Sequence, residues 1–339
     1  MTTNVRVSIL IKALNEEAKI SHCLDSAVRE AVSVGGEVIL TDSLSTDRTV
    51  EIARKFPVRI IQFESVGDCC CGAATQVGYQ YSYGEYLYLL DGDMELEPGF
   101  IALALDYLEE DPSAAGVGGF IRDTQIKTHA DKRRIERCNS IDRVMYVDSL
   151  GGGGLYRRSA IESVGYLANR WLKACEEVEL GVRLKSEGWH LIRLPESAAT
   201  HTGHNESDIR MICRLWRSGR IRAYGVFLSS AIGRPWWWMS VRQTWFVFIA
   251  PAIYLVAIVF SWLLISMDVV TFHAILIPVT LLWSLAFLAL LIKKGKVSDA
   301  VFAIVAWHIY SLATASGFFE KVDDPHRPIL TREVWDSDI

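Results

Sequence analysis

Two aspartates follow the apolar run EYLYLL in the segment EYLYLLDGDMEL, residues 85–96. Asp91 and Asp93 are separated by a single glycine, so their charges repel each other if nothing lies between them. A tight turn is one explanation, because Asp and Gly are common turn residues. Paired carboxylates at the end of a strand also suit a hard divalent cation, which takes oxygen ligands and often bridges to phosphates.

Polar residues also follow two other apolar runs. Asn15 and Glu17 come after residues 5–11, and Asp42 and Asp47 come after residues 37–41. Taken singly, these are ordinary turn and helix-capping residues. The carboxyl ends of parallel strands meet at one edge of a sheet, however, and ligands bind there in α/β folds. Three acidic strand ends on one edge therefore predict a binding site.

The elements that must position these residues are short strands alternating with helices. Apolar residues recur at helical spacing through residues 20–31, and STDRTVEIARKF at 45–56 opens with capping-type residues. The strands are predicted at residues 5–11, 37–41, 58–63 and 86–90. Their apolar character suits a sheet covered on both faces, so the pattern predicts an α/β fold with a mostly parallel sheet.

Two later segments could complete a site. Four glycines at residues 151–154 would allow close backbone approach to a sugar or phosphate, because no Cβ obstructs it; a flexible loop is the alternative. A helix with an acidic start is predicted within residues 171–189, where Val178 and Val182 have helical spacing. Acidic first turns often only complement the helix dipole. Trp171, just before this helix, could stack on a sugar or simply pack.

Composition points to a membrane part. Hydrophobic residues make up 50% of the 339 residues, which is high for a purely soluble protein. The formal net charge of −5 argues against a general nucleic-acid binder. Charge is nevertheless uneven, because residues 209–267 contain seven Arg and no Asp or Glu. We predict a basic helix at about residues 206–224 that lies at the membrane surface and includes Arg217.

Two membrane spans are predicted at about residues 245–266 and 272–292, because each run is about 20 residues long and apolar. A third, at 298–319, carries Asp299 and His308, and a re-entrant or interfacial helix is the alternative there. Arginines precede the first span and KKGK follows the second, so both flanks are expected in the cytoplasm.

This charge pattern fixes the expected topology. Residues 1–230 are expected to form a cytoplasmic domain, 231–320 a membrane domain, and 321–339 a polar tail. The tail would lie outside if the third span crosses, and inside if it does not. The amino terminus shows no secretory signal, and the seven cysteines fit reduced thiols better than disulfides. The predicted location is the inner, cytoplasmic membrane, as a multi-pass protein with its catalytic domain in the cytoplasm.

Five motifs in series carry a resemblance to a known family. They are VSILIKALNEE, ILTDSLSTDRT, GEYLYLLDGDMELEPGF, GGGGLYRRSAIESVGY and EEVELGVRLKSEGW. In order and approximate spacing, residues 5–205 resemble inverting glycosyltransferases of family 2. The resemblance implies a GT-A fold, a Rossmann-like nucleotide-diphospho-sugar transferase domain, here followed by carboxyl-terminal transmembrane helices. It also implies a nucleotide-sugar donor, with a UDP-sugar favoured, and Mn²⁺ or Mg²⁺ as cofactor.

The resemblance carries over residue by residue. Asn15 and Glu17 stand where the nucleotide pocket begins, Asp42 matches the aspartate that contacts the base, and Asp47 matches the last aspartate of the same motif. Asp93 would ligate the metal, and Asp91 would contact the metal or the ribose. Lys12 and Leu14 depart from the family pattern, which has Pro and an aromatic residue there.

The remaining implied roles concern catalysis and the acceptor. Glu177 matches the general base that takes the proton of the acceptor hydroxyl, and Glu176 is its rival. His201 would be a third metal ligand. Arg217 lies where the family has a loop that gates the donor site. Apart from the resemblance, the residue types themselves make Gly153, Gly154 and Trp171 the predicted acceptor contacts.

The resulting hypothesis is a membrane-bound inverting glycosyltransferase. It would move a sugar from a nucleotide-diphosphate sugar to a lipid-linked saccharide acceptor in surface or exopolysaccharide biosynthesis. One alternative is a polyprenyl-phosphate sugar synthase. Another is a non-catalytic membrane module that binds nucleotide sugars, which the substituted motif TDSLSTD permits.

Overall fold

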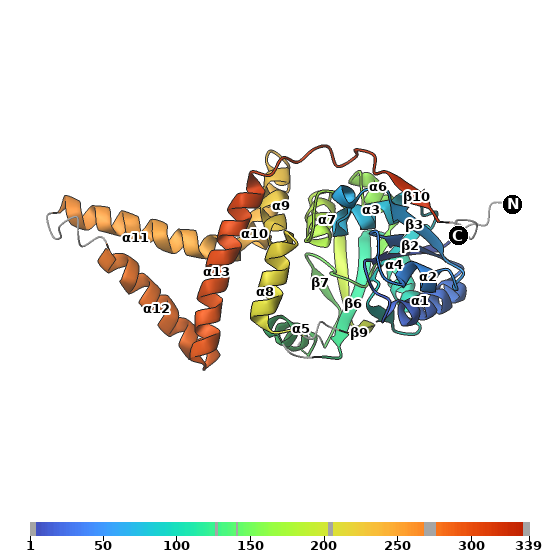
Figure 1. The fold of residues 1–339 in the computed structure, drawn as a ribbon, viewed down its shortest axis with the longest axis horizontal. Coiled ribbons are helices and arrows are strands. Elements are labelled where there is room, and N and C mark those ends of the chain that lie inside the picture. The colour runs from blue at the N-terminus through green and yellow to red at the C-terminus, as the bar shows by residue number, and fades with distance from the viewer. Residues whose placement is uncertain (1–4, 126–127, 140–141, 203–205, 268–275, 335–339) are drawn as a thin grey trace. The chain divides into compact units, whose positions relative to one another are not determined.

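The computed structural model describes residues 5–125, 128–139, 142–202, 206–267 and 276–334, and the chain forms two compact units (Figure 1). The first unit comprises residues 1–213 together with 322–339, and the second comprises residues 214–321. The boundary therefore falls earlier than the expected residue 230. The segment expected to be a separate polar tail folds with the amino-terminal unit.

One ten-stranded sheet organises the described part of the first unit. Its order is β10-β3-β2-β1-β4-β8-β6-β9-β5, with β7 paired to β9. The strands are β1 (Val7–Ala13), β2 (Glu37–Asp42), β3 (Arg59–Phe63), β4 (Tyr86–Asp91), β5 (Met94–Leu96), β6 (Ala114–Asp123), β7 (Met145–Val147), β8 (Gly154–Arg157), β9 (His190–His201) and β10 (Thr331–Glu333).

The four predicted strands are β1 to β4, and they pair in parallel with one another in the order β3-β2-β1-β4. Strands β5, β7, β8 and β10 each pair antiparallel with a neighbour, so the sheet is mixed and not mostly parallel. These four strands are only three or four residues long, too short to show a period in the sequence.

Helices cover both faces of the sheet, as the apolar strands predicted (Figure 1). The helices of this part are α1 (Ile20–Val34), α2 (Thr49–Ala53), α3 (Cys71–Gln80), α4 (Phe100–Glu110), α5 (His129–Asn139), α6 (Arg158–Ser163), α7 (Glu176–Ser186) and the start of α8 (Asp208–Arg217). One core packs α1 and α4 against Ile9 of β1 and Tyr88 of β4. The other packs α3, α6 and α7 against Leu10 and Leu89. Successive residues of one strand thus enter opposite cores.

The carboxyl-terminal segment is fastened to the edge of this sheet. Strand β10 pairs antiparallel with β3, and Arg59 forms an ion pair with Glu333 at 3.1 Å. The buried guanidinium of Arg170 donates to the carbonyls of Arg327, at 2.7 Å, and Pro328, at 2.6 Å. Since the strand ladder and the two hydrogen bonds from Arg170 hold it, this segment is an integral part of the first unit.

The second unit is helical. It contains η2 (Arg220–Arg222), α9 (Ala223–Ala231), α10 (Trp237–Gln243), η3 (Trp245–Phe248), α11 (Ile249–Ser266), α12 (Leu276–Lys294) and α13 (Val297–Phe318). Among the described residues, three helical segments are long and apolar enough to cross a membrane: Trp245–Ser266, Leu276–Lys294 and Val297–Phe318. Residues 272–275 of the second predicted span lie outside the described residues. The predicted basic helix ends as α8 at Arg217, and Gly219 adopts a left-handed φ of 74° before η2.

Candidate active site

The sheet brings the predicted strand ends together. In the register of the parallel strands, Ala13 lies opposite Asp42, and Lys12 lies opposite Asp91. The carboxyl ends of β2 and β4 therefore flank the end of β1. This arrangement places Asp42 and Asp91 on the same edge, where open α/β sheets bind ligands.

Three predicted nucleotide-binding residues join the loops after β1 and β2. Asn15, held at a left-handed φ of 56°, accepts a hydrogen bond from the Thr46 N–H at 2.8 Å. The Glu17 N–H donates to Asp47 at 3.0 Å, and Asp47 also accepts from the Thr49 N–H at 2.9 Å. Desolvation opposes ionisation of Asp47, but the hydrogen bonds from Thr49 lower its pKa. These side chains shape the edge of the site; their contact with a nucleotide stays a prediction.

Asp42 presents a buried acceptor at the end of β2. Its side chain is fully buried, and Oδ2 accepts from the Ser45 N–H at 3.0 Å and from Gln62 Nε2 at 2.8 Å. Within the described residues, Oδ1 has no hydrogen-bond partner. A buried carboxylate oxygen without a partner is costly, so a ligand N–H donor would be favoured there.

Asp93 lies beside an imidazole. His201 Nε2 is 3.1 Å from Asp93 Oδ2, and His201 Nδ1 is 2.6 Å from Asp123 Oδ1. The sheet register produces this contact, because His201 at the end of β9 pairs with both Met94 and Asp123. With Nδ1–H donated to Asp123, Nε2 is the nitrogen available to a metal, which is the usual carboxylate–histidine–metal arrangement.

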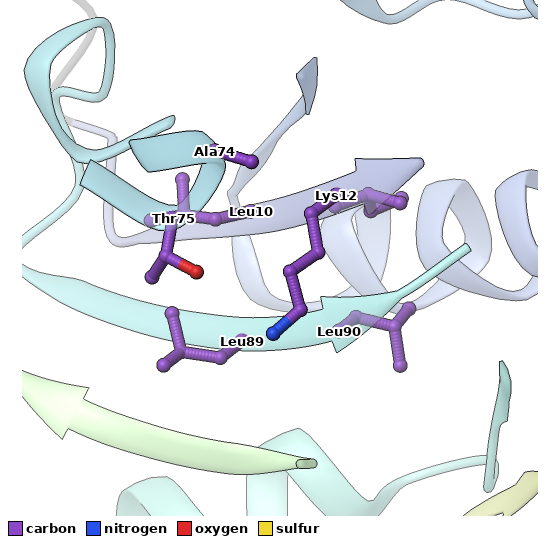
Figure 2. A pocket seen from close by; sticks show the side chains of 7 residues that line it. Leu10, Lys12, Ala74, Thr75, Leu89 and Leu90 are labelled. Carbon is purple, nitrogen blue, oxygen red and sulfur yellow. The ribbon is translucent and has the colours of Figure 1, made fainter. Parts of the chain in front are cut away.

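Two lysines that sequence reasoning did not place in the site compensate the aspartates. Lys12 Nζ is 3.2 Å from Asp91 Oδ1 and 2.6 Å from Glu176 Oε1. Burial lowers the pKa of Lys12, but these two carboxylates outweigh it and raise the pKa, so the ammonium stays charged. Figure 2 shows its side chain reaching from β1 across to β4, beside a small cavity. Lys19 Nζ is 3.6 Å from Asp93 Oδ2.

The acidic character of this edge extends to Glu16. Desolvation and the neighbouring charge of Asp93 raise the pKa of Glu16 to about 7. The edge thus holds more negative charge than Lys12 and Lys19 neutralise. A dication or a cationic group from a ligand would therefore be stabilised there.

The side chains present fit a divalent metal in their chemistry. Asp93 and His201 offer an oxygen and a nitrogen donor 3.1 Å apart. Across the part of the chain that the structure describes, no three His, Cys, Asp or Glu side chains group closely enough to hold a metal by themselves. Ions such as Mg²⁺ are often bound by one or two carboxylates together with substrate phosphates, which matches a two-donor site completed by a ligand.

Helix α7 delivers two glutamates with different surroundings. Glu176 is buried and bound to Lys12. Glu177 is partly exposed, and a Cβ built on Gly151 would lie 3.8 Å from its Oε2, so it faces the glycine loop. Desolvation raises the pKa of Glu177 to about 8, Lys12 opposes the shift, and Glu176 and Asp91 add to it. A carboxylate with this pKa is a better proton acceptor than an ordinary glutamate.

The glycine loop divides into two parts. Gly153 and Gly154 are buried, and a Cβ on Gly153 would lie 2.9 Å from Ile121. Gly154 begins β8, whereas Gly151 and Gly152 are partly exposed. The surface available to an acceptor is therefore formed by Gly151 and Gly152; contact of Gly153 or Gly154 with an acceptor stays a prediction.

The last two predicted residues have other contacts. Trp171 Nε1 donates to the Asp324 carbonyl at 3.4 Å, and the Arg170 guanidinium lies 4.8 Å from its ring centre. Trp171 thus packs against the carboxyl-terminal segment, and its contact with an acceptor stays a prediction. Arg217 belongs to the second unit, so it is not among the residues that the first unit brings together.

Comparison with known proteins identifies the domain. The model of the family Glycosyl transferase family 2 matches residues 8–165, which include most of β1, all of β2, Asp91, Asp93 and the glycine loop. A 4,4'-diaponeurosporenoate glycosyltransferase of Staphylococcus haemolyticus is 32% identical over 98 residues, 28% of this chain and 26% of that protein. A chondroitin synthase of Pasteurella multocida is 34% identical over 116 residues, 33% of this chain and 12% of that protein.

These matches span about a quarter or less of the two relatives. The crystal structure of residues 1–349 of S. aureus TarS is 12% identical, covers 94% of both chains and has a TM-score of 0.51. The same protein in complex with UDP-GlcNAc gives a TM-score of 0.52. At this identity the likeness concerns the fold, a mixed α/β sheet of GT-A type. Residues 8–165 are therefore a glycosyltransferase family 2 domain.

Proposed function

We propose that this chain is a membrane-bound inverting glycosyltransferase. It would transfer a sugar from a nucleotide-diphosphate sugar to a lipid-linked saccharide in surface or exopolysaccharide biosynthesis, on the cytoplasmic face of the inner membrane. The observation that carries the proposal is the position of Glu177, which faces the glycine loop, with a pKa raised to about 8, in the charged environment of Asp91 and Lys12.

The chemistry follows from these groups. Glu177 would accept the proton of an acceptor hydroxyl while its oxygen forms a bond to the anomeric carbon. The bond between that carbon and the diphosphate oxygen breaks on the opposite face, and its electron pair leaves with the nucleotide diphosphate. Lys12 and Lys19 form ion pairs with Asp91 and Asp93, and they would stabilise the departing charge.

A divalent metal is part of the proposal. Asp93 and His201 would hold Mn²⁺ or Mg²⁺, with Asp91 beside them. When bound, the metal would neutralise charge on the diphosphate.

A saccharide acceptor is favoured over a polyprenyl phosphate by the need for a base. A phosphate acceptor is already an anion at neutral pH and attacks without losing a proton. A sugar hydroxyl requires a proton acceptor, and Glu177 supplies one with a suitable pKa. The UDP-GlcNAc complex of TarS supports a UDP-sugar as donor.

Donor hydrolysis tests the proposal directly. Detergent-solubilised protein is incubated with a panel of UDP-, GDP- and dTDP-sugars, with Mn²⁺ or with EDTA, and nucleotide release is measured. We expect metal-dependent release from one nucleotide class. Absence of both binding and release for the whole panel would instead support a non-catalytic module.

Replacing Asp42 by Asn is expected to raise the donor KM about 10- to 100-fold with little change in kcat. The substitution replaces either Oδ1, which is free to accept from a ligand, or Oδ2, which accepts from Gln62, by an NH₂ group, so one acceptor is lost. Asp25→Asn, on the exposed face of α1, is the control. An unchanged donor KM in Asp42→Asn would remove Asp42 from the nucleotide pocket.

Activity is expected to increase with pH up to about 8. Because the pKa of Glu177 is raised to about 8, most molecules carry it protonated at pH 6, and a protonated carboxyl cannot accept the acceptor proton. The transfer kcat/KM of the free enzyme should therefore rise about tenfold per unit below that value and level off above it. The profile is measured with constant Mn²⁺ between pH 6 and 9. A flat profile would contradict the assignment.

A further inference from the structure

Both ends of the second unit, residues 214–321, connect to the first unit. Residues 1–213 and 322–339 share a sheet, through the pairing of β10 with β3. The Val334 N–H also donates to the Ile60 carbonyl at 2.9 Å, and the Glu64 N–H to the Leu330 carbonyl at 3.1 Å. A folded unit lies on one side of a membrane. The chain from residue 214 to residue 321 must therefore cross an even number of times, and the three apolar helices cannot all cross.

Hydropathy and charge indicate which two cross. Helix α11 with the turn before it has a mean hydropathy of 2.5, α12 has 2.1 and α13 only 1.4. Lysines 293, 294 and 296 separate α12 from α13. If α11 and α12 cross, these lysines are on the same side as the first unit, as the preference of basic loops for the cytoplasm requires. Either pairing that uses α13 would place all three on the opposite side.

The carboxyl-terminal half of α13 packs against residues that precede α11. Ser311 Oγ donates to the Val247 carbonyl at 2.6 Å, and Glu320 forms an ion pair with Arg222 at 2.8 Å. A Cβ on Gly317 would lie 2.0 Å from the Arg222 carbonyl, so the backbones touch there. Val247 and Arg222 precede α11. The carboxyl-terminal half of α13 thus lies beside the residues through which the chain enters α11.

One face of α13 remains apolar and exposed. Val297, Val301, Val305, Leu312 and Phe319 are exposed and recur at intervals of four and seven residues, which is one side of a helix. Such a face suits contact with the acyl chains of lipids.

We infer that the chain crosses the membrane twice, through α11 and α12, and that α13 lies along the cytoplasmic leaflet with its valine-rich face in the lipid. The inference rests on the membrane location in the proposed function. It places the segment after α13 in the cytoplasm and excludes the three-span topology.

A split fluorescent protein reports the topology of the full chain. The small complementing tag is placed at the amino terminus, at the carboxyl terminus, or after Met267, and the large fragment is expressed in the cytoplasm. We expect fluorescence from both terminal tags and none from the tag after Met267. When the large fragment is added after detergent permeabilisation, all three proteins must become fluorescent. This control shows that each tag can bind the large fragment.

Other patterns would overturn the inference. A dark carboxyl-terminal tag beside a bright amino-terminal tag would mean an odd number of crossings. Three bright tags would mean no crossing, and this result would also remove the membrane anchor from the proposed function. Nucleotide release by the same tagged proteins tests the catalytic proposal separately, because it does not depend on the number of spans.

Lysine substitution distinguishes a helix at the membrane surface from a helix that spans the membrane. Val305 in α13 and Val259 in α11 are 47% and 48% exposed, so they form a matched pair. Val259→Lys should reduce the membrane-integrated protein about tenfold, because a cation near the middle of a span is costly. Val305→Lys should leave it within about twofold, since the side chain can extend to the headgroups. Equal losses would show that α13 is as deep as α11.

Discussion

Replacing Glu177 by Gln is expected to lower kcat for sugar transfer about 10²- to 10⁴-fold while the donor KM changes less than about threefold. The amide keeps the size of the side chain but cannot accept the proton of the acceptor hydroxyl. Initial rates at saturating donor and acceptor measure the effect. The remaining activity should also lose its rise with pH, because the group that titrates at about 8 is gone.

Glu176→Gln is the matched control, since the two residues are adjacent on α7. Glu176 is already bound to Lys12 at 2.6 Å, so its loss should disturb the Lys12–Asp91 pair and reduce activity less than the loss of Glu177. If Glu176→Gln abolished transfer and Glu177→Gln did not, the roles would be reversed. If Glu177→Gln spared transfer to a polyprenyl phosphate, the acceptor class would be wrong and the donor site right.

Replacing Asp93 by Asn is expected to reduce nucleotide release about 10²- to 10³-fold and to make the residual rate insensitive to EDTA. The carboxylate is one of the two donors that the structure brings together for a metal, and the amide carries no charge to hold the cation. The measurement is nucleotide release across a Mn²⁺ titration.

Glu95→Gln is the control for this substitution. Glu95 lies two residues from Asp93 and is exposed. Its substitution therefore removes the same charge without changing a side chain of the site. A normal Mn²⁺ dependence in Asp93→Asn would contradict the metal assignment. Equal losses in both variants would indicate a general effect of charge on this edge.

The common edge of Asp42 and Asp91 could be predicted from the sequence because strands β1, β2 and β4 are apolar runs that each end in acidic residues. Parallel pairing then places such ends together whatever the exact register. The acidic start of α7 was visible for a similar reason, since helical spacing and the two glutamates are local features.

Contacts that depend on long-range pairing could not be predicted. Asp123 reaches His201 only through the register of β6 against β9, which no local pattern encodes. Lys12 was visible only as a departure from the family pattern, and its two carboxylate partners are 79 and 164 residues away. Strand β10 reads TRE, a short polar segment without the alternation that predicts a strand.

The pairing of β10 with β3 also sets an order of assembly. Strand β10 follows α13 in the chain, so it is synthesised after the three long apolar helices α11, α12 and α13. Until then the outer edge of β3 has unpaired backbone groups, and the buried guanidinium of Arg170 lacks the two carbonyls that it binds in the finished fold. The sheet is thus completed only after residues 214–321 have been synthesised. Under the proposed function, the nascent domain would reach its final form after the helices that anchor it.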